Sequence, residues 1–241
     1  MITKNEIKQV ASLRQQKFRK ELGLFVVEGR KMVEELLHSG FAIKALYATN
    51  AHIDLFPQAE TVNEMQMEQM SGQDTPPGIL AVVSIPTKQQ LSSSPTLILA
   101  LDGIANPGNM GTIIRSAEWF GIRDIVCSPD CVEVWNPKVI QATMGSIFRA
   151  NIIEADLTQF LPEQQRQGRA IYGALLEGEN LFELKKREKG IVVIGSESHG
   201  IREAVLPFIS CPITIPRVGA SLTESLNASV AAGIIMAELT R

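Results

Sequence analysis

The segment at 106–118 combines glycines, amides and one arginine at a spacing that could hold a phosphate. Gly108 and Gly111 would let the backbone approach a ligand closely, and Asn109 could cap the helix that follows. Arg115 lies six residues beyond Asn109, less than two helical turns away. A helix N-terminus beside an arginine favours phosphate. A capped helix whose arginine forms a surface ion pair explains these residues equally well, so both interpretations stay open.

A second segment, GSESHG at 195–200, places one carboxylate in a tight loop. Gly195 and Gly200 bracket the loop, and Glu197 stands where a dinucleotide-binding GxGxxG pattern would have its middle glycine. No GxGxxG occurs elsewhere in the sequence. His199 could act as a base, but a single loop histidine is more often incidental, so we do not count it as catalytic.

The third segment, at 215–231, places polar side chains in a small, apolar surrounding. Ser225, Asn227 and Ser229 would lower helix propensity inside a helix, so packing alone would rarely select them. Alternatively, a Ser or Thr caps the last helix and a neighbouring loop satisfies Asn227. The small residues could equally indicate tight helix packing, within the chain or across a dimer.

The elements that must position these segments form a regular series. Short apolar runs alternate with helical stretches at 97–101, 125–127, 152–153, 170–175, 191–194 and 213–215. This alternation predicts an α/β domain with a parallel sheet covered on both faces. Ligands of such sheets bind at the carboxyl ends of the strands. Each of the three segments directly follows a strand, so we expect them to form one site.

A smaller α/β region precedes this domain, starting with a capping box at Thr3 and Glu6. The polar, proline-bounded stretch 84–95 is the predicted linker, which gives domains at 1–90 and 96–241. Residues 1–31 hold eight basic and three acidic residues, a local charge of +5 on a chain of net charge −3. This end could bind a polyanion, although a solvated helix face remains an alternative.

Composition excludes several other classes of protein. Hydrophobic residues make up 45% and charged residues 20%, which is ordinary for a globular protein. Three cysteines without a CxxC pair argue against a disulfide framework or a zinc site. No apolar run is long enough for a secretory signal or a membrane span. We therefore expect a soluble, cytoplasmic protein without a metal ion.

Together, NPGNMGTIIRSA, GSESHG and IPRVGASLTESLNASVAAGI strongly resemble the three motifs of the SpoU/TrmH class of RNA ribose methyltransferases, in the SPOUT superfamily. The resemblance covers 96–241. FVVEGRKMVEELL at 25–37 resembles the L30e-like substrate-binding domain of many members. The resemblance implies a carboxyl-terminal trefoil knot that binds S-adenosylmethionine, a homodimer, and transfer of a methyl group to an RNA 2′-hydroxyl.

The resemblance also implies roles for individual residues. The family's polar active-site positions correspond to Asn109, Arg115, Glu197, Ser225 and Asn227. Its cofactor-binding positions correspond to Gly195, Gly200, Ile215 and Leu226, with Leu175 and Leu176 contributing from a strand end. Because a guanidinium is effectively always protonated, we expect Arg115 to grip an RNA phosphate rather than act as a base. Glu197 would orient Arg115 or Asn109.

One residue departs from the family pattern. Arg217 stands where the family usually has Met after Ile-Pro, and the loop from Ile215 to Leu226 is slightly long. Arg217 could instead reach an RNA phosphate.

Three alternatives to the main interpretation remain. The chain could be a non-catalytic RNA-binding knot protein, or a base-methylating enzyme on the same scaffold. A nucleotide-dependent oxidoreductase is disfavoured by the absent GxGxxG. Ribosomal RNA is the first expectation for the substrate and transfer RNA the second, and the sequence does not indicate which nucleotide is modified.

Overall fold

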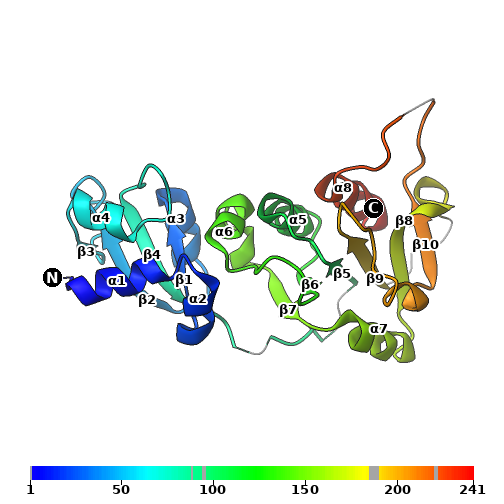
Figure 1. Ribbon diagram of the computed structural model, residues 1–241, viewed down its shortest axis with the longest axis horizontal. Coiled ribbons are helices and arrows are strands. Elements are labelled where there is room, and N and C mark those ends of the chain that lie inside the picture. The colour runs from blue at the N-terminus through cyan, green and yellow to red at the C-terminus, as the bar shows by residue number, and fades with distance from the viewer. Residues whose placement is uncertain (1, 88, 94–95, 185–189, 220–221) are drawn as a thin grey trace. The chain divides into compact units, whose positions relative to one another are not determined.

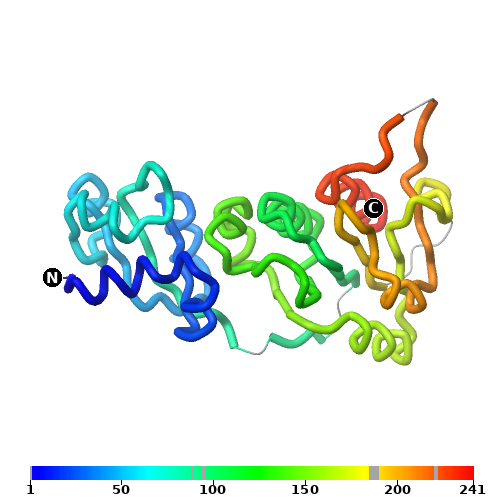
Figure 2. Tube along the Cα trace, viewed as in Figure 1, coloured from blue at the N-terminus to red at the C-terminus, as the bar shows by residue number. Residues whose placement is uncertain are grey.

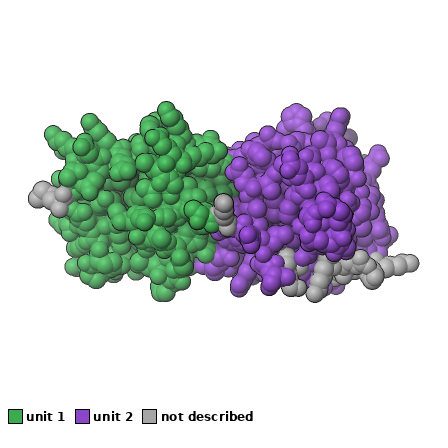
Figure 3. Space-filling model, turned by 90° about the horizontal axis from the view of Figure 1, so that it is seen from below, with its two compact units in different colours: residues 1–87, 133–148 green, residues 88–132, 149–241 purple. Residues whose placement is uncertain are grey.

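The computed structural model describes all residues except 1, 88, 94–95, 185–189 and 220–221. It divides into two compact units, coloured separately in Figure 3. The first comprises 1–87 and 133–148, and the second comprises 88–132 and 149–241. The sequence placed 133–148 inside the second domain, whereas the structure groups this segment with the first unit. The domain limits at 1–90 and 96–241 otherwise stay a prediction.

The first unit has a four-stranded sheet in the order β1-β4-β2-β3 (Figure 1). Strand β4 is antiparallel to both β1 and β2, and β3 is parallel to β2. The predicted capping box at Thr3 and Glu6 is confirmed at the start of the first helix. The elements are α1 (Lys4–Ser12), α2 (Gln16–Leu22), β1 (Leu24–Glu28), α3 (Arg30–Leu37), β2 (Ile43–Ala48), β3 (Glu60–Thr61), α4 (Glu64–Met70), β4 (Ile79–Ser84), α6 (Pro137–Thr143) and η1 (Ser146–Phe148).

Residues 133–148 join the first unit through one buried ion pair and an aromatic cluster. The Arg19 guanidinium is buried, binds the Glu133 carboxylate, and donates to the Leu13 carbonyl oxygen at 2.8 Å. The Trp135 ring lies 4.8 Å from that of Phe25, centroid to centroid. A buried guanidinium is costly unless it is paired, so Glu133 cannot leave without destabilising α2. No local pattern predicts a pairing between residues so far apart in the sequence.

The second unit contains a six-stranded parallel sheet in the order β10-β8-β9-β5-β6-β7. This confirms the predicted parallel α/β architecture, and each of the six apolar runs forms a strand. The elements are β5 (Leu97–Asp102), α5 (Pro107–Trp119), β6 (Asp124–Cys127), β7 (Asn151–Glu154), α7 (Leu157–Arg166), β8 (Ala170–Asn180), η2 (Leu181–Glu183), β9 (Gly190–Gly195), η3 (Leu206–Phe208), β10 (Cys211–Thr214) and α8 (Ala228–Leu239).

Helices cover both faces of this sheet. Because side chains alternate along a strand, Ile98 and Ala100 of β5 share one face, where they pack in a buried cluster with Leu157 and Leu161 of α7. Helices α5 and α8 pack together on the other side (Figure 1). The two faces together leave the central strands fully buried, so the sheet is a rigid base for the loops at its carboxyl edge.

Residues 215–219 and 222–227, which lie between β10 and α8, extend outward from the second unit (Figure 2). Among them, Val218 is 90% and Leu222 is 97% exposed. The predicted trefoil knot stays a prediction. In the described part of the chain, no helix has the length and apolar character that crossing a membrane requires.

Candidate functional site

Two of the three chemistry-bearing segments begin side by side at the sheet edge. Strands β5 and β9 are parallel neighbours, and their last residues, Asp102 and Gly195, are register partners. The next residues are also close, because a Cβ built on Gly103 would lie 3.8 Å from the Ser196 Cβ. The sheet register therefore places the segments at 103–109 and 196–200 against each other.

Helix α5 begins three residues earlier than the sequence indicated. Asn106 is its N-cap, and the Asn106 Oδ1 accepts from the Asn109 backbone N–H at 3.0 Å. The prediction that Asn109 caps this helix is therefore wrong. Pro107 explains the shift, because proline has no N–H to satisfy and its fixed φ suits the first helical position. The Asn109 side chain is left available for contacts outside the helix.

The Asn109 amide joins all three segments. Its Nδ2 donates to Oε1 of Glu197 from the second segment. Its Oδ1 accepts from Nδ2 of Asn227, from the third segment, at 3.1 Å. We refer to Asn109, Glu197 and Asn227 as the amide–carboxylate network. Of the two partners that the sequence suggested for Glu197, the structure selects Asn109 and not Arg115.

Asn227 also starts helix α8. Its Oδ1 accepts from the Ser229 backbone N–H at 2.9 Å and from the Ser229 hydroxyl at 2.6 Å. The alternative in which a Ser or Thr caps this helix is therefore wrong, since the cap is an asparagine. Because the helix begins at Ala228, Ser225 and Asn227 precede it rather than interrupt it.

Arg115 and Ser225 stand outside this network. Both are exposed, Arg115 on helix α5 and Ser225 just before helix α8. Neither side chain forms a hydrogen bond or ion pair with any other residue that the structure describes. The surface ion pair offered as an alternative for Arg115 is thus not found among these residues.

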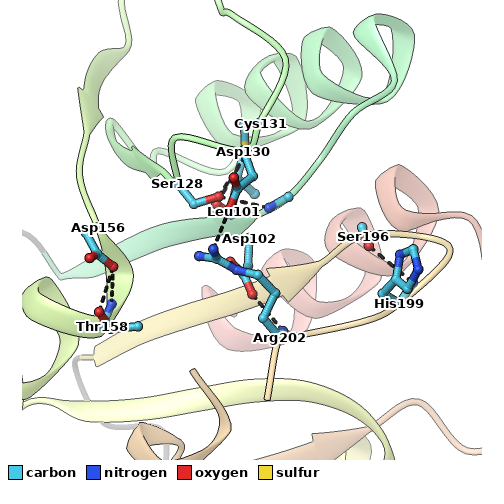
Figure 4. A network of polar contacts seen from close by, with 11 residues as sticks. Leu101, Asp102, Ser128, Asp130, Cys131, Asp156, Thr158, Ser196, His199 and Arg202 are labelled. Carbon is cyan, nitrogen blue, oxygen red and sulfur yellow. Dashed lines mark hydrogen bonds and ion pairs between the residues drawn. The ribbon is translucent and has the colours of Figure 1, made fainter. Parts of the chain in front are cut away.

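The loop that carries Glu197 is a tight hairpin held by its two glycines. Ser196 and Gly200 exchange backbone hydrogen bonds of 3.0 and 2.9 Å. Gly200 has a φ of +66°, a conformation that L side chains rarely adopt. A Cβ at Gly195 would collide with the Gly200 backbone. His199 contacts its own loop, with its backbone N–H donating to the Ser196 Oγ at 3.2 Å (Figure 4).

Beneath this hairpin lies an ion pair that sequence reasoning missed. Asp102 is fully buried, and both of its carboxylate oxygens bind Arg202 (Figure 4). Burial lowers the pKa of the Arg202 guanidinium, but the hydrogen bond and charge of Asp102 outweigh this, so the net shift is upward. The sequence did contain one signal for this ion pair, because Asp102 is a charged residue at the end of an otherwise apolar strand.

These features match a known family. The model of the SpoU rRNA Methylase family matches residues 96–237, more than half of the chain. The chain belongs to the SpoU rRNA methylase family. Residues 4–81 match the MRM3-like substrate binding domain. Both matches confirm the resemblance drawn from the motifs.

Relatives and solved structures agree with this SpoU assignment. The 23S rRNA (guanosine(2553)-2′-O)-methyltransferase RlmP of Bacillus subtilis is 27% identical, over 97% of this chain and 95% of its own length. A TrmH-family protein from Porphyromonas gingivalis superimposes with a TM-score of 0.91 at 36% identity, covering 99% of this chain and 98% of that one. An AdoMet-bound rRNA methyltransferase from Sinorhizobium meliloti gives 0.88 at 25% identity, covering 99% and 95%.

As a SpoU methylase, the chain is an S-adenosylmethionine-dependent RNA methyltransferase. The residues predicted to bind this cofactor stay a prediction, and the structure shows where some of them lie. Leu176 on β8 is 71% exposed and Leu226 is 45% exposed, so both offer apolar surface. Backbone groups lie alongside, since the Leu176 carbonyl oxygen accepts from the Thr214 hydroxyl at 3.0 Å, next to Ile215.

The structure also places the residue that departs from the family pattern. The Arg217 guanidinium donates to the Glu224 carbonyl oxygen. The two ends of the exposed segment between β10 and α8 are therefore linked to each other. The expectation that Arg217 reaches an RNA phosphate stays a prediction.

Proposed function

We propose that this SpoU enzyme transfers the methyl group of S-adenosylmethionine to a ribose 2′-hydroxyl of ribosomal RNA. The observation that carries the proposal is the amide–carboxylate network, which brings one residue from each motif to a single point at the sheet edge. The relative from B. subtilis bears the name of a 23S rRNA 2′-O-methyltransferase, which supports both the ribose and the ribosomal substrate.

The network residues would hold the hydroxyl. When bound, S-adenosylmethionine supplies an electrophilic methyl group. An ionised carboxylate only accepts hydrogen bonds, so the second oxygen of Glu197, which has no partner among the described residues, can accept one from the 2′-hydroxyl. The Asn109 amide fixes the direction of that carboxylate. Holding reactants in line is worth about 7–11 kcal/mol in the best cases.

Arg115 would bind the RNA. It projects from the same helix as Asn109, and its guanidinium is both exposed and unpaired within the described structure. A guanidinium stays protonated at all physiological pH values and presents a fork that matches phosphate oxygens. Arg115 therefore grips the phosphate beside the target ribose, while the hydroxyl proton leaves through its hydrogen bond to Glu197 and passes on to that phosphate or to a water molecule.

The first unit would add salt-sensitive RNA affinity that does not depend on sequence. Lys4, Lys8, Lys17 and Lys20 are exposed on its first two helices. Two arginines of the basic end are already engaged inside the unit: Arg19 binds Glu133, and Arg14 donates to the Gln69 carbonyl oxygen at 2.8 Å. The RNA-facing charge is therefore smaller than the sequence count indicates, and it resides mainly on lysines.

The predicted homodimer and cytoplasmic location belong to the same proposal. Exposed apolar side chains support a dimer formed through the second unit. Trp119 at the end of α5 is 83% exposed, and Val230 on the adjacent α8 is 50% exposed. Burying such side chains against a second copy would remove apolar area from water.

Replacing Arg115 with alanine tests the proposal. Arg115→Ala should abolish methyl transfer and spare binding of S-adenosylmethionine, because the guanidinium serves the RNA. The control is Arg166→Ala, since Arg166 is an exposed arginine of α7 whose ion pair among the described residues is with Glu163. The assay follows tritiated methyl transfer to rRNA from cells lacking the gene, with calorimetry for the cofactor.

The modified nucleoside decides between the remaining functions. Mass spectrometry of the digested product should identify a 2′-O-methylated ribose. A methylated base would establish the base-methylating alternative instead. Near-normal turnover of Arg115→Ala would refute the assigned role of Arg115, and a wild-type protein that labels no RNA would favour the non-catalytic alternative.

A further inference from the structure

Asp102 and Arg202 form a directional pair at the base of the site. The Arg202 Nε donates to one Asp102 oxygen at 2.7 Å, and the Arg202 backbone N–H donates to the other at 2.8 Å. Asp102 has no solvent exposure, and among the described residues both of its oxygens are bound by Arg202. The Arg202 guanidinium also contacts the exposed Asp130 (Figure 4).

The pair lies between the two loops that carry Asn109 and Glu197. Asp102 ends β5 and immediately precedes the segment that leads to Asn109. Arg202 follows Gly200 by two residues and therefore lies just after the point where the Glu197 hairpin closes. The two loops share two tethers, since the Asp102–Arg202 pair joins their bases and the Asn109–Glu197 bond joins their tips.

Stability alone does not explain such a pair. Replacing a buried ion pair with well-packed apolar residues is often neutral or stabilising, so a buried pair is weak evidence for a stabilising role. A carboxylate held by a side-chain N–H and a backbone N–H is instead fixed in both distance and direction. That property matters most where a small displacement carries a large cost, as it does between reacting groups.

We propose that Asp102 and Arg202 are positioning residues that set the Glu197 hairpin against Asn109, and thereby hold the ribose hydroxyl in the orientation for methyl transfer. The proposal rests on the function proposed above. Neither residue touches the reacting atoms. Loss of the pair lets the hairpin shift, so the RNA and cofactor still bind but the hydroxyl is held in line for less of the time.

Two variants of Arg202 distinguish the direction of its hydrogen bond to Asp102 from the positive charge that it supplies. Arg202→Met removes the guanidinium from Asp102 and leaves only the backbone N–H. Arg202→Lys keeps a positive charge for Asp102, so the fold survives, but its point-like ammonium cannot reproduce the fixed direction of the guanidinium N–H. Asp130→Asn and Arg166→Met are controls, because each alters only an exposed ion pair, which is worth little.

Two measurements then decide the matter. In methyl transfer to rRNA from cells lacking the gene, both Arg202 variants should lower kcat about 10–100-fold, with KM for RNA and Kd for S-adenosylmethionine within about twofold. Hydrogen–deuterium exchange should be faster at the Ser196 and Gly200 amides and unchanged in α7. The two controls should match the wild type in both.

Three outcomes would overturn the inference. A wild-type kcat in Arg202→Lys means that the pair only neutralises Asp102. Unchanged hydrogen–deuterium exchange at the hairpin means that the pair does not hold the hairpin. This measurement does not depend on activity, so it remains valid even if the wild type methylates no RNA, an outcome that would refute the proposed function instead. A kcat loss confined to Arg202→Met, in step with a lower Tm, means that the role is structural.

Discussion

Asn227 combines two tasks that substitution can separate. Its Oδ1 caps helix α8 by accepting from the Ser229 and Val230 amides, at 2.9 and 3.4 Å. Its Nδ2 donates to Asn109 at 3.1 Å. Asn227→Ala removes both tasks. Asn227→Asp keeps an oxygen for the cap but has no N–H to donate to the Asn109 Oδ1. The Asn109 Nδ2 can then donate either to this new carboxylate or to that of Glu197.

The structure sets the size of each effect. Loss of an N-cap costs about 1 kcal/mol, and loss of an exposed amide hydrogen bond adds about 0.5–1 kcal/mol. Asn227→Ala should therefore lower the free energy of unfolding by about 1.5–2 kcal/mol, or the Tm by about 3–8 °C for a chain of this length. Asn227→Asp should lower the free energy of unfolding by only about 0.5–1 kcal/mol, because it loses the bond to Asn109 but aspartate caps as well as asparagine and favours a helix N-terminus.

Activity should follow the other task. Both variants should lower kcat about 10–100-fold, because both break the bond to Asn109 that aligns Glu197. Thermal unfolding and single-turnover methyl transfer, measured on the same preparations, give the comparison. The capping argument fails if Asn227→Asp loses as much stability as Asn227→Ala. The network argument fails if Asn227→Asp turns over at the wild-type rate.

Two further predictions concern groups away from the network. Glu133→Ala should lower the free energy of unfolding, measured in urea, by about 3–5 kcal/mol, because it leaves the buried Arg19 without its counter-charge. The double variant with Arg19→Met should recover part of this loss. A loss below about 1 kcal/mol in Glu133→Ala would contradict the argument. A hydrogen bond from the buried Cys127 thiol lowers the pKa of Cys131 to about 7. Alkylation of Cys131 by iodoacetamide should therefore rise through pH 7 and level off above it, and a continued rise to pH 9 would contradict the shift.

Local sequence signals predicted the elements of the second unit well. Each apolar run became a strand, because a strand buried on both faces leaves a continuous hydrophobic signature. Helix starts were predicted less well, since several neighbouring residues could serve as the cap. Asn106 rather than Asn109 caps α5, and Asn227 rather than Ser or Thr caps α8. The competing candidates differ only in which backbone N–H groups they can reach.

The partners of the site residues could not be read from the sequence. Asn109 meets Glu197 and Asn227, which lie 88 and 118 residues away. The parallel register of β5 with β9 and the packing of α5 on α8 decide those meetings. The Asp102–Arg202 pair shows the same dependence, because neither residue belongs to a recognisable motif.

The sequence by itself determined the chemistry available at 106–118, 195–200 and 215–231, and that each of these segments follows a strand. Residue types and strand periodicity are local properties, so they can be read from the sequence without the fold. Tertiary structure alone decided which amide contacts which carboxylate and which arginines are bound inside the first unit. It also decided that 133–148 folds with that unit. Those outcomes depend on burial, since a charged group removed from water must find a partner wherever in the chain that partner lies.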